Sequence, residues 1–196
     1  MSGAAEGSQG EPRSLRPYSE RLLRLASAAI DHGLNRGSRM EVDLGCHPAP
    51  LLDWRACFVT LRLGGELRGC VGSVEPRRPL VSDIAENAYT AAFGDPRFPG
   101  LTAAERKELS LKLEILSPME CLNFRTEAEL LARLEPGRDG LLLEAGHCRG
   151  TFLPTVWSSL PDPEEFWKQL KRKAGLPSDR FSTAITVYRY RTEILP

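Results

Sequence analysis

Arg68 and Cys70 are the two residues of this sequence whose types and spacing are best suited to chemistry. The segment 66–72 follows a two-residue turn signal and predicts a strand, on which side chains two residues apart point to the same face. A guanidinium next to a thiol favours the thiolate, which is the nucleophilic form of cysteine. Gly69 and Gly72 would let a ligand or another backbone approach closely. The spacing therefore predicts a small anion- or carbonyl-binding site around a reactive sulfur.

A purely structural role for Cys70 is the alternative interpretation. Free cysteine is among the most frequently buried residue types, and it usually packs as a small hydrophobic residue. Gly69 and Gly72 would then mark a bulge or close packing against the helix predicted over residues 79–93. For a cysteine in a single sequence this interpretation is the commoner one, and the sequence leaves both open.

Arg68 needs an acidic partner if it is buried beside Cys70, because a buried guanidinium without one is costly. Asp95 and Glu114 are the candidates, and Arg97 could add a second positive group. We therefore hypothesise that one polar cleft is lined by Arg68, Cys70, Asp95, Arg97 and Glu114. The alternative is that these charges only lock a strand to a loop through salt bridges.

The remaining cysteines and histidines give no sign of a metal site. Cys46 with His47 and His147 with Cys148 are adjacent pairs, and adjacent residues seldom bind one metal ion together. No CxxC motif occurs among the five cysteines, so reduced thiols in a cytosol fit better than a disulfide scaffold. We expect no metal and no cofactor, since P-loop, GxGxxG, GxSxG and HExxH motifs are absent.

Charge and hydropathy argue against two classes of partner. The chain has 26 basic and 26 acidic residues, whereas a protein that holds nucleic acid needs a positive field. The sequence contains no signal peptide and no apolar run long enough for a membrane span. We therefore expect a cytoplasmic protein that binds neither membrane nor nucleic acid.

The elements that must position Arg68 and Cys70 alternate between strand pairs and helices. Helices are predicted over residues 19–34, 79–93, 127–134 and 163–174, and strands over residues 56–63, 66–72, 111–115, 140–144 and 184–191, the last one in the chain. Adjacent strand pairs without a βαβ series favour antiparallel sheet with packed helices, an α+β fold. Residues 1–17 are predicted to be a disordered tail and residues 18–196 a single domain.

Local signals support several of these elements. Gly64 and Gly65 predict a two-residue hairpin turn, because the favoured turns need positive φ at both central positions. Gly94 could end the helix over residues 79–93 in the left-handed conformation. Thr102 and Glu105 form a capping box, which predicts the start of a short helix.

Residues 67–72, LRGCVG, closely resemble the LRGCIG signature of the AMMECR family, with Val71 in place of isoleucine. Further blocks resemble those of the family in the same order: DPRFP at residues 95–99, LEILSP at 113–118, GRDGL at 137–141, FLP at 152–154 and the helix at 166–176. Because the match runs from about Tyr18 to Ile194, the chain is identified as a member of this family, with an AMMECR-type domain over residues 18–196.

The resemblance implies an α+β fold with a larger and a smaller subdomain and a groove between them. Members of the family have no established biochemical activity, and microbial members resemble one component of a set that includes a Memo-type protein and a radical-SAM protein. The resemblance therefore implies that this chain is an accessory component that binds a small molecule, a peptide or a partner protein in the cleft. The candidate binding residues are Arg68, Gly69, Gly72, Asp95, Arg97 and Glu114. The alternative is a thiol-dependent enzyme with Cys70 as its nucleophile.

Overall fold

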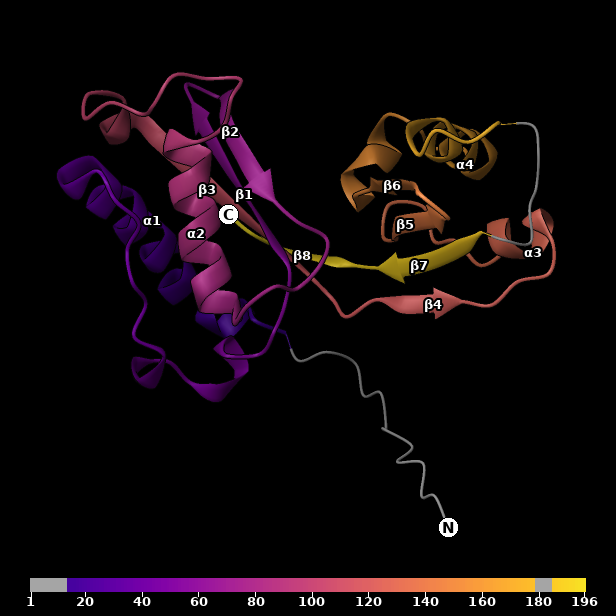
Figure 1. The fold of residues 1–196 in the computed structure, drawn as a ribbon, viewed down its shortest axis with the longest axis horizontal. Helices are drawn as coiled ribbons and strands as arrows, with labels where there is room; N and C mark the ends of the chain where they lie inside the picture. The colour runs from indigo at the N-terminus through magenta and orange to yellow at the C-terminus, as the bar shows by residue number, and fades with distance from the viewer. Residues whose placement is uncertain (1–13, 179–184) are drawn as a thin grey trace, which may run out of the picture.

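The two β-sheets of the protein lie side by side in a computed structural model that describes residues 14–178 and 185–196 (Figure 1). Each sheet has four strands, all paired antiparallel, and helices pack on both sheets. The predicted α+β class is therefore confirmed. None of the described helices is long and apolar enough to cross a lipid bilayer.

The first sheet has the strand order β2-β1-β3-β8. Its strands are β1 (Cys57–Leu63), β2 (Glu66–Gly72), β3 (Leu109–Leu116) and β8 (Thr192–Leu195), and two long helices, α1 (Ser19–Arg36) and α2 (Leu80–Phe93), cover one of its faces (Figure 1). Leu22 and Ile30 of α1 and Ile84 of α2 are fully buried against Val59 and Leu61 of β1. This helix-covered face forms the main core.

The second sheet has the strand order β4-β7-β5-β6 and carries its own helices. Its elements are β4 (Glu120–Leu122), β5 (Gly140–Ala145), β6 (Cys148–Phe152), β7 (Thr186–Tyr190), α3 (Glu127–Leu131) and α4 (Pro163–Lys173). Trp157, Phe166 and Trp167 are the largest side chains of the second core. Short 3-10 helices occupy Arg16–Tyr18, Leu44–Cys46, Ala49–Leu51, Glu105–Glu108 and Pro154–Ser158.

The chain crosses between the two sheets twice. The chain passes from β3 to β4 and returns from β7 to β8, and Ser117 and Arg191 bridge the two crossings (Figure 1). The backbone N–H of Ser117 donates to the carbonyl of Arg191 at 2.8 Å, and that of Arg191 donates to the Ser117 hydroxyl at 2.9 Å. A third cluster of apolar residues, which includes Leu116, Leu142 and Tyr190, fills the space between the sheets.

The turn and cap residues discussed here lie where the sequence predicted them, with one difference in backbone conformation. Gly64 and Gly65 have φ values of 57° and 88° and close the β1–β2 hairpin as predicted. The Asp162 side chain caps α4 through the Glu165 N–H at 2.9 Å. Gly94 does end α2, but its φ is −125°, so the predicted left-handed cap is wrong.

The strand inventory and the tail differ from expectation. β4, β6 and β8 were not among the predicted strands, and β8, not the strand ending near residue 191, is the last strand. Ala184, the predicted start of that strand, and residues 1–13 of the predicted tail lie outside the described residues. Within the rest of that tail, Leu15 is buried, and its N–H donates to Glu193 at 2.8 Å. The packed chain therefore begins before Tyr18.

Candidate functional site

Cys70 lies on β2, an edge strand, and its backbone is held by a loop in place of a neighbouring strand. The Cys70 N–H donates to Asp95 Oδ2 at 2.9 Å, and the Arg97 guanidinium donates to the Cys70 carbonyl at 3.1 Å. Asp95 and Arg97 also pair with each other at 2.7 Å. Arg97, and then the Cys70 N–H, hold the pKa of Asp95 well below its usual range. The two side chains thus protect the exposed edge at Cys70.

Arg68 pairs with Glu105 and not with the predicted Asp95 or Glu114. Its Nε and Nη2 donate to the two carboxylate oxygens of Glu105 at 2.8 and 3.2 Å, and Nη2 also donates to the Pro99 carbonyl at 2.9 Å. The guanidinium lowers the pKa of Glu105 to about 2. Because Nε and Nη2 bind both Glu105 and the Pro99 carbonyl, Arg68 anchors the loop that precedes β3.

The predicted alternation along β2 is interrupted at Arg68. Leu61 pairs with Gly69 but Arg62 pairs with Leu67, so Arg68 is the extra residue of a β-bulge. A Cβ at Gly69 would collide with the carbonyl oxygen of Ala91 in α2. Close packing against α2 therefore accounts for Gly69, as the structural interpretation expected.

Gly72 also meets protein backbone. A Cβ there would collide with the Cys57 carbonyl oxygen and with Phe58 on the neighbouring strand. Neither glycine needs a ligand to explain its identity, and their role in binding stays a prediction.

The Cys70 side chain points away from α1 and α2. Cys70 pairs with Thr60 across the β1–β2 ladder, and its sulfur lies 3.4 Å from the Thr60 hydroxyl. Lys112 pairs with Thr60 and Glu114 pairs with Phe58, so all five residues share one face of the sheet. We call this the junction face, because Phe58 packs with residues of the second sheet. Cys70 is half-buried there.

Glu114 is the most unusual residue of the junction face. The residue is 4% exposed, and its Oε1 accepts no hydrogen bond from any described residue. Lys112 Nζ is 3.3 Å away, which gives charge compensation without hydrogen-bond geometry. Sequence reasoning placed Glu114 in the site but missed Thr60 and Lys112, which only strand register identifies.

The second sheet contributes a phenol and a hydroxyl near this face. The Tyr190 hydroxyl lies 2.7 Å from Thr151 Oγ1 and 3.1 Å from the Phe152 carbonyl. Burial raises the pKa of Tyr190, and the negative charge of Glu114 raises it further. No sequence signal marked Tyr190, because alternation in a strand is equally typical of sheet packing.

A pocket opens between the two sheets beside the junction face. Its volume is about 290 Å³. It is lined by Arg138, which precedes β5, by Thr155, which follows β6, and by Thr192 and Ile194 of β8. Ile194 is the register partner of Glu114, so the pocket adjoins the part of the face where the unpartnered oxygen lies. This is the concave feature that the expected groove between subdomains requires.

The five residues of the predicted cleft are only partly brought together. Cys70, Asp95 and Arg97 are in direct contact, but through the cysteine backbone. Arg68 contacts Glu105 and Pro99, and Glu114 lies two strands away from Cys70 on the junction face. For Arg68, Asp95 and Arg97, the geometry is that of the strand-to-loop lock that the sequence left open.

A further polar cluster is buried between β1 and α2. Asp83 accepts a hydrogen bond from Asn87 at 3.0 Å and one from the Cys57 thiol at 3.4 Å. Burial raises the pKa of Asp83 and raises that of Cys57 well above its usual value. The cluster lies under the helix, where Arg78 Nε is also 3.5 Å from Asp83, and it shares no residue with the junction face.

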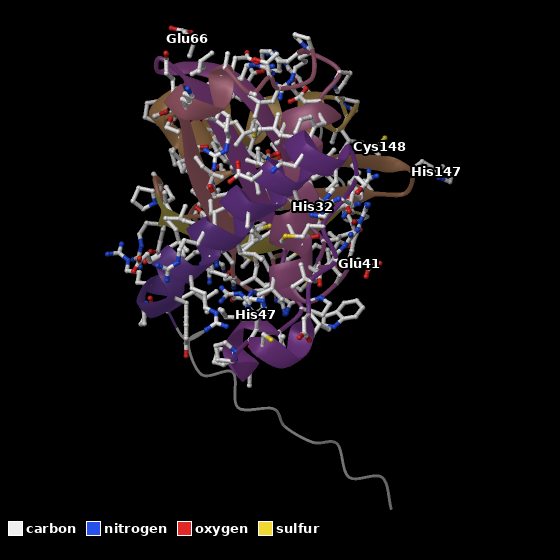
Figure 2. The ribbon with its side chains drawn as sticks, turned by 90° about the vertical axis from the view of Figure 1, so that its left-hand side faces the viewer. His32, Glu41, His47, Glu66, His147 and Cys148 are labelled. Atoms are coloured by element: carbon white, nitrogen blue, oxygen red, sulfur yellow. The ribbon has the colours of Figure 1, made fainter. Side chains whose placement is uncertain are left out.

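The two adjacent histidine–cysteine pairs lie at separate places. Figure 2 shows His47 at the lower end of the molecule and His147 and Cys148 on the projecting β5–β6 hairpin. Across residues 14–178 and 185–196, no group of three or more His, Cys, Asp or Glu side chains could hold a metal ion. The absence of a metal and a cofactor stays a prediction.

Known proteins resemble this chain over nearly its full length. The family model named AMMECR1 matches residues 23–195. A protein of Methanothermobacter thermautotrophicus is 39% identical over 178 residues, which cover 88% of this chain and 91% of that protein. One of Methanocaldococcus jannaschii is 36% identical and covers 88% and 86%. The crystal structure of an uncharacterised protein from Pyrococcus horikoshii matches with a TM-score of 0.79 at 34% identity, covering 91% of this chain and 90% of that one.

Proposed function

This chain belongs to the AMMECR1 family, and we propose that it is an accessory component that binds a ligand or partner at the junction face. The partners we propose are a radical-SAM enzyme and a Memo-type protein, on the family association described above. We place this assembly in the cytoplasm, where the five cysteines, all free, would stay reduced.

The observation that carries the proposal is the buried Oε1 of Glu114, which has Lys112 Nζ at 3.3 Å as its counter-charge but accepts no hydrogen bond from a described residue. A buried carboxylate oxygen without a hydrogen bond is costly, and native proteins seldom keep one without a use. A ligand or partner that offers an N–H or O–H donor would remove this cost on binding. The pocket at Ile194 gives such a donor a route to the neighbourhood of Glu114.

The surroundings of Cys70 support binding better than nucleophilic chemistry. Arg68 binds Glu105 and the Pro99 carbonyl through Nε and Nη2, and no described hydrogen bond joins it to the Cys70 sulfur that the thiol-enzyme hypothesis has it activate. The hydrogen-bond partner of the sulfur is the Thr60 hydroxyl, which is no general base. Asp95 and Arg97 fix the backbone at Cys70, which favours a rigid binding surface.

A thiol-dependent enzyme remains the second candidate because the Cys70 side chain is half-buried and faces the junction. The pH profile of Cys70 alkylation in the folded protein separates the two. The binding proposal expects slow labelling of Cys70 near neutral pH. Rapid labelling near neutral pH, lost in Cys70→Ser, would favour the enzyme.

The proposal is tested by calorimetric titration of this chain with a purified Memo-type protein and with a purified radical-SAM protein. Glu114→Gln should weaken binding by about 10- to 100-fold, which is the worth of a hydrogen bond to a charged group. Glu66→Gln at the exposed hairpin turn is the matched control and should leave the Kd unchanged. The proposal fails if neither protein binds, or if Glu114→Gln binds as tightly as Glu66→Gln.

A further inference from the structure

A second pocket lies where the segment that precedes β1 meets the residues that follow β3. Its volume is about 560 Å³, which is within the range of small-molecule sites. It is lined by Leu15, Ala49, Pro50, Asp53, Trp54, Arg55 and Pro118. The segment is pinned in place, since Leu80 N–H donates to the Asp53 carbonyl at 3.0 Å and Trp54 bridges to Pro79.

Arg55 is a half-buried guanidinium with no described carboxylate at ion-pair distance, although Glu193 and Asp53 lie near enough to interact with its charge. Its Nε donates to the Leu116 carbonyl at 3.2 Å, but no described residue accepts a hydrogen bond from its two terminal nitrogens. Both terminal nitrogens remain accessible to solvent. The described side-chain atoms that are fully buried and lack a hydrogen bond are His47 Nδ1 and Glu114 Oε1. Burial lowers the pKa of Arg55, which reflects the cost of holding this charge partly out of water.

The other arginines that are at least half-buried are all paired. Within the described parts of the chain, each has a carboxylate at ion-pair distance: Arg68, Arg78, Arg106, Arg189 and Arg191. Arg55 is the exception in this group. Since buried charges in proteins are normally paired, the pocket holds an anion-binding group that the chain itself does not satisfy.

Trp54 supplies the apolar wall. It is 64% exposed, although tryptophan normally buries a large apolar surface, and prolines flank it in the pocket. Asp53 is exposed and brings one negative charge to balance that of Arg55. The lining residues are therefore mostly apolar and carry no net charge among themselves, and Glu193 lies near Arg55 but beyond ion-pair distance.

We propose that this pocket binds an apolar monocarboxylate, whose carboxylate pairs with the terminal nitrogens of Arg55 and whose apolar body packs on Trp54. A guanidinium presents parallel N–H groups that match a carboxylate. Asp53 disfavours a second negative charge, so a dicarboxylate binds worse. The same chemistry is offered by a free acid and by the C-terminal carboxylate of an apolar peptide.

Trp54 provides the assay, because Trp157 and Trp167 are 3% and 1% exposed. Quenching of tryptophan fluorescence by acrylamide, a neutral quencher, therefore reports mainly on Trp54. The probes are 3-phenylpropionate, its amide and benzylmalonate, together with an apolar tripeptide as free acid and as C-terminal amide. We expect saturable protection of Trp54 by one or both monoacids, and at least tenfold weaker protection by the matching amides and by benzylmalonate.

Variants assign the effect to the pocket. Arg55→Gln should weaken protection by the acid about tenfold or more, and Asp53→Asn should improve protection by benzylmalonate. If Arg55→Gln does not fold, the acid–amide comparison in the unmodified chain decides the question. Protection by the small acid alone assigns a metabolite-type ligand, and protection by the peptide alone assigns a peptide terminus. Equal protection by acid and amide, or none at millimolar concentration, overturns the proposal.

Discussion

The Arg68–Glu105 pair should contribute measurable stability that disappears in acid. The Arg68 side chain is 9% exposed and that of Glu105 is 26% exposed, so the pair lies between a buried and a surface salt bridge. Breaking a fully buried pair costs about 3–5 kcal/mol, and a surface pair is worth about 0–1 kcal/mol. We therefore expect Glu105→Gln to lower the free energy of unfolding by about 2 kcal/mol at neutral pH.

The pH dependence follows from the lowered pKa of Glu105. Its value in the folded chain is about 2, against 4.5 for the unperturbed group, so the folded state prefers the charged form. The stabilisation is therefore complete above about pH 5 and is lost as the pH falls from about 4.5 to 2. Near pH 2 the protonated glutamate resembles glutamine, and the two proteins should unfold alike.

Thermal and denaturant unfolding measure this difference directly. For a chain of this length about 2 kcal/mol corresponds to a Tm lower by about 4–8 °C. Glu108→Gln, in the same 3-10 segment and exposed, is the matched control and should change stability by less than about 0.5 kcal/mol. The reasoning is refuted if Glu105→Gln is as stable as Glu108→Gln, or if its deficit is independent of pH.

Two further expectations concern the edge strand and the buried cluster. Asp95→Asn should speed amide hydrogen exchange at Cys70 roughly tenfold or more, because the charged acceptor of its N–H is lost; unchanged exchange contradicts the edge clamp. Asp83, whose pKa burial raises, stabilises the fold in its protonated form, and this contribution is lost as the pH rises through the raised folded pKa. Asp83→Asn should therefore gain stability relative to the unmodified chain as the pH rises above about 4 in denaturant titrations, and a constant difference would contradict this.

The elements with strong periodicity were predictable, and the short ones were not. The boundaries of α1, α2, the β1–β2 hairpin and α4 follow from apolar spacing, glycine turns and an aspartate cap. β4 has three residues and β8 has four, too few to show alternation. The sequence does not mark the point near Arg191 where the chain leaves the second sheet for the first, because the alternating pattern of side chains continues from β7 into β8.

The site was predictable in its residues but not in its pairings. Glu105 was assigned to a capping box, and it does accept from the Thr102 N–H at 2.8 Å while also binding Arg68. A sequence cannot show one carboxylate serving two partners. The bulge at Arg68 likewise broke the assumption that residues two apart share a face in register. The missing hydrogen bond at Glu114 Oε1 is a property of tertiary packing alone.

The most direct test of the junction face is amide chemical-shift mapping of the isotope-labelled chain during titration with the Memo-type and radical-SAM proteins. Our account predicts that the largest shifts cluster at Thr60, Cys70 and Glu114, and that Glu66 at the distant hairpin turn is unaffected. Shifts that avoid these three residues, or no shifts with either protein, would contradict it.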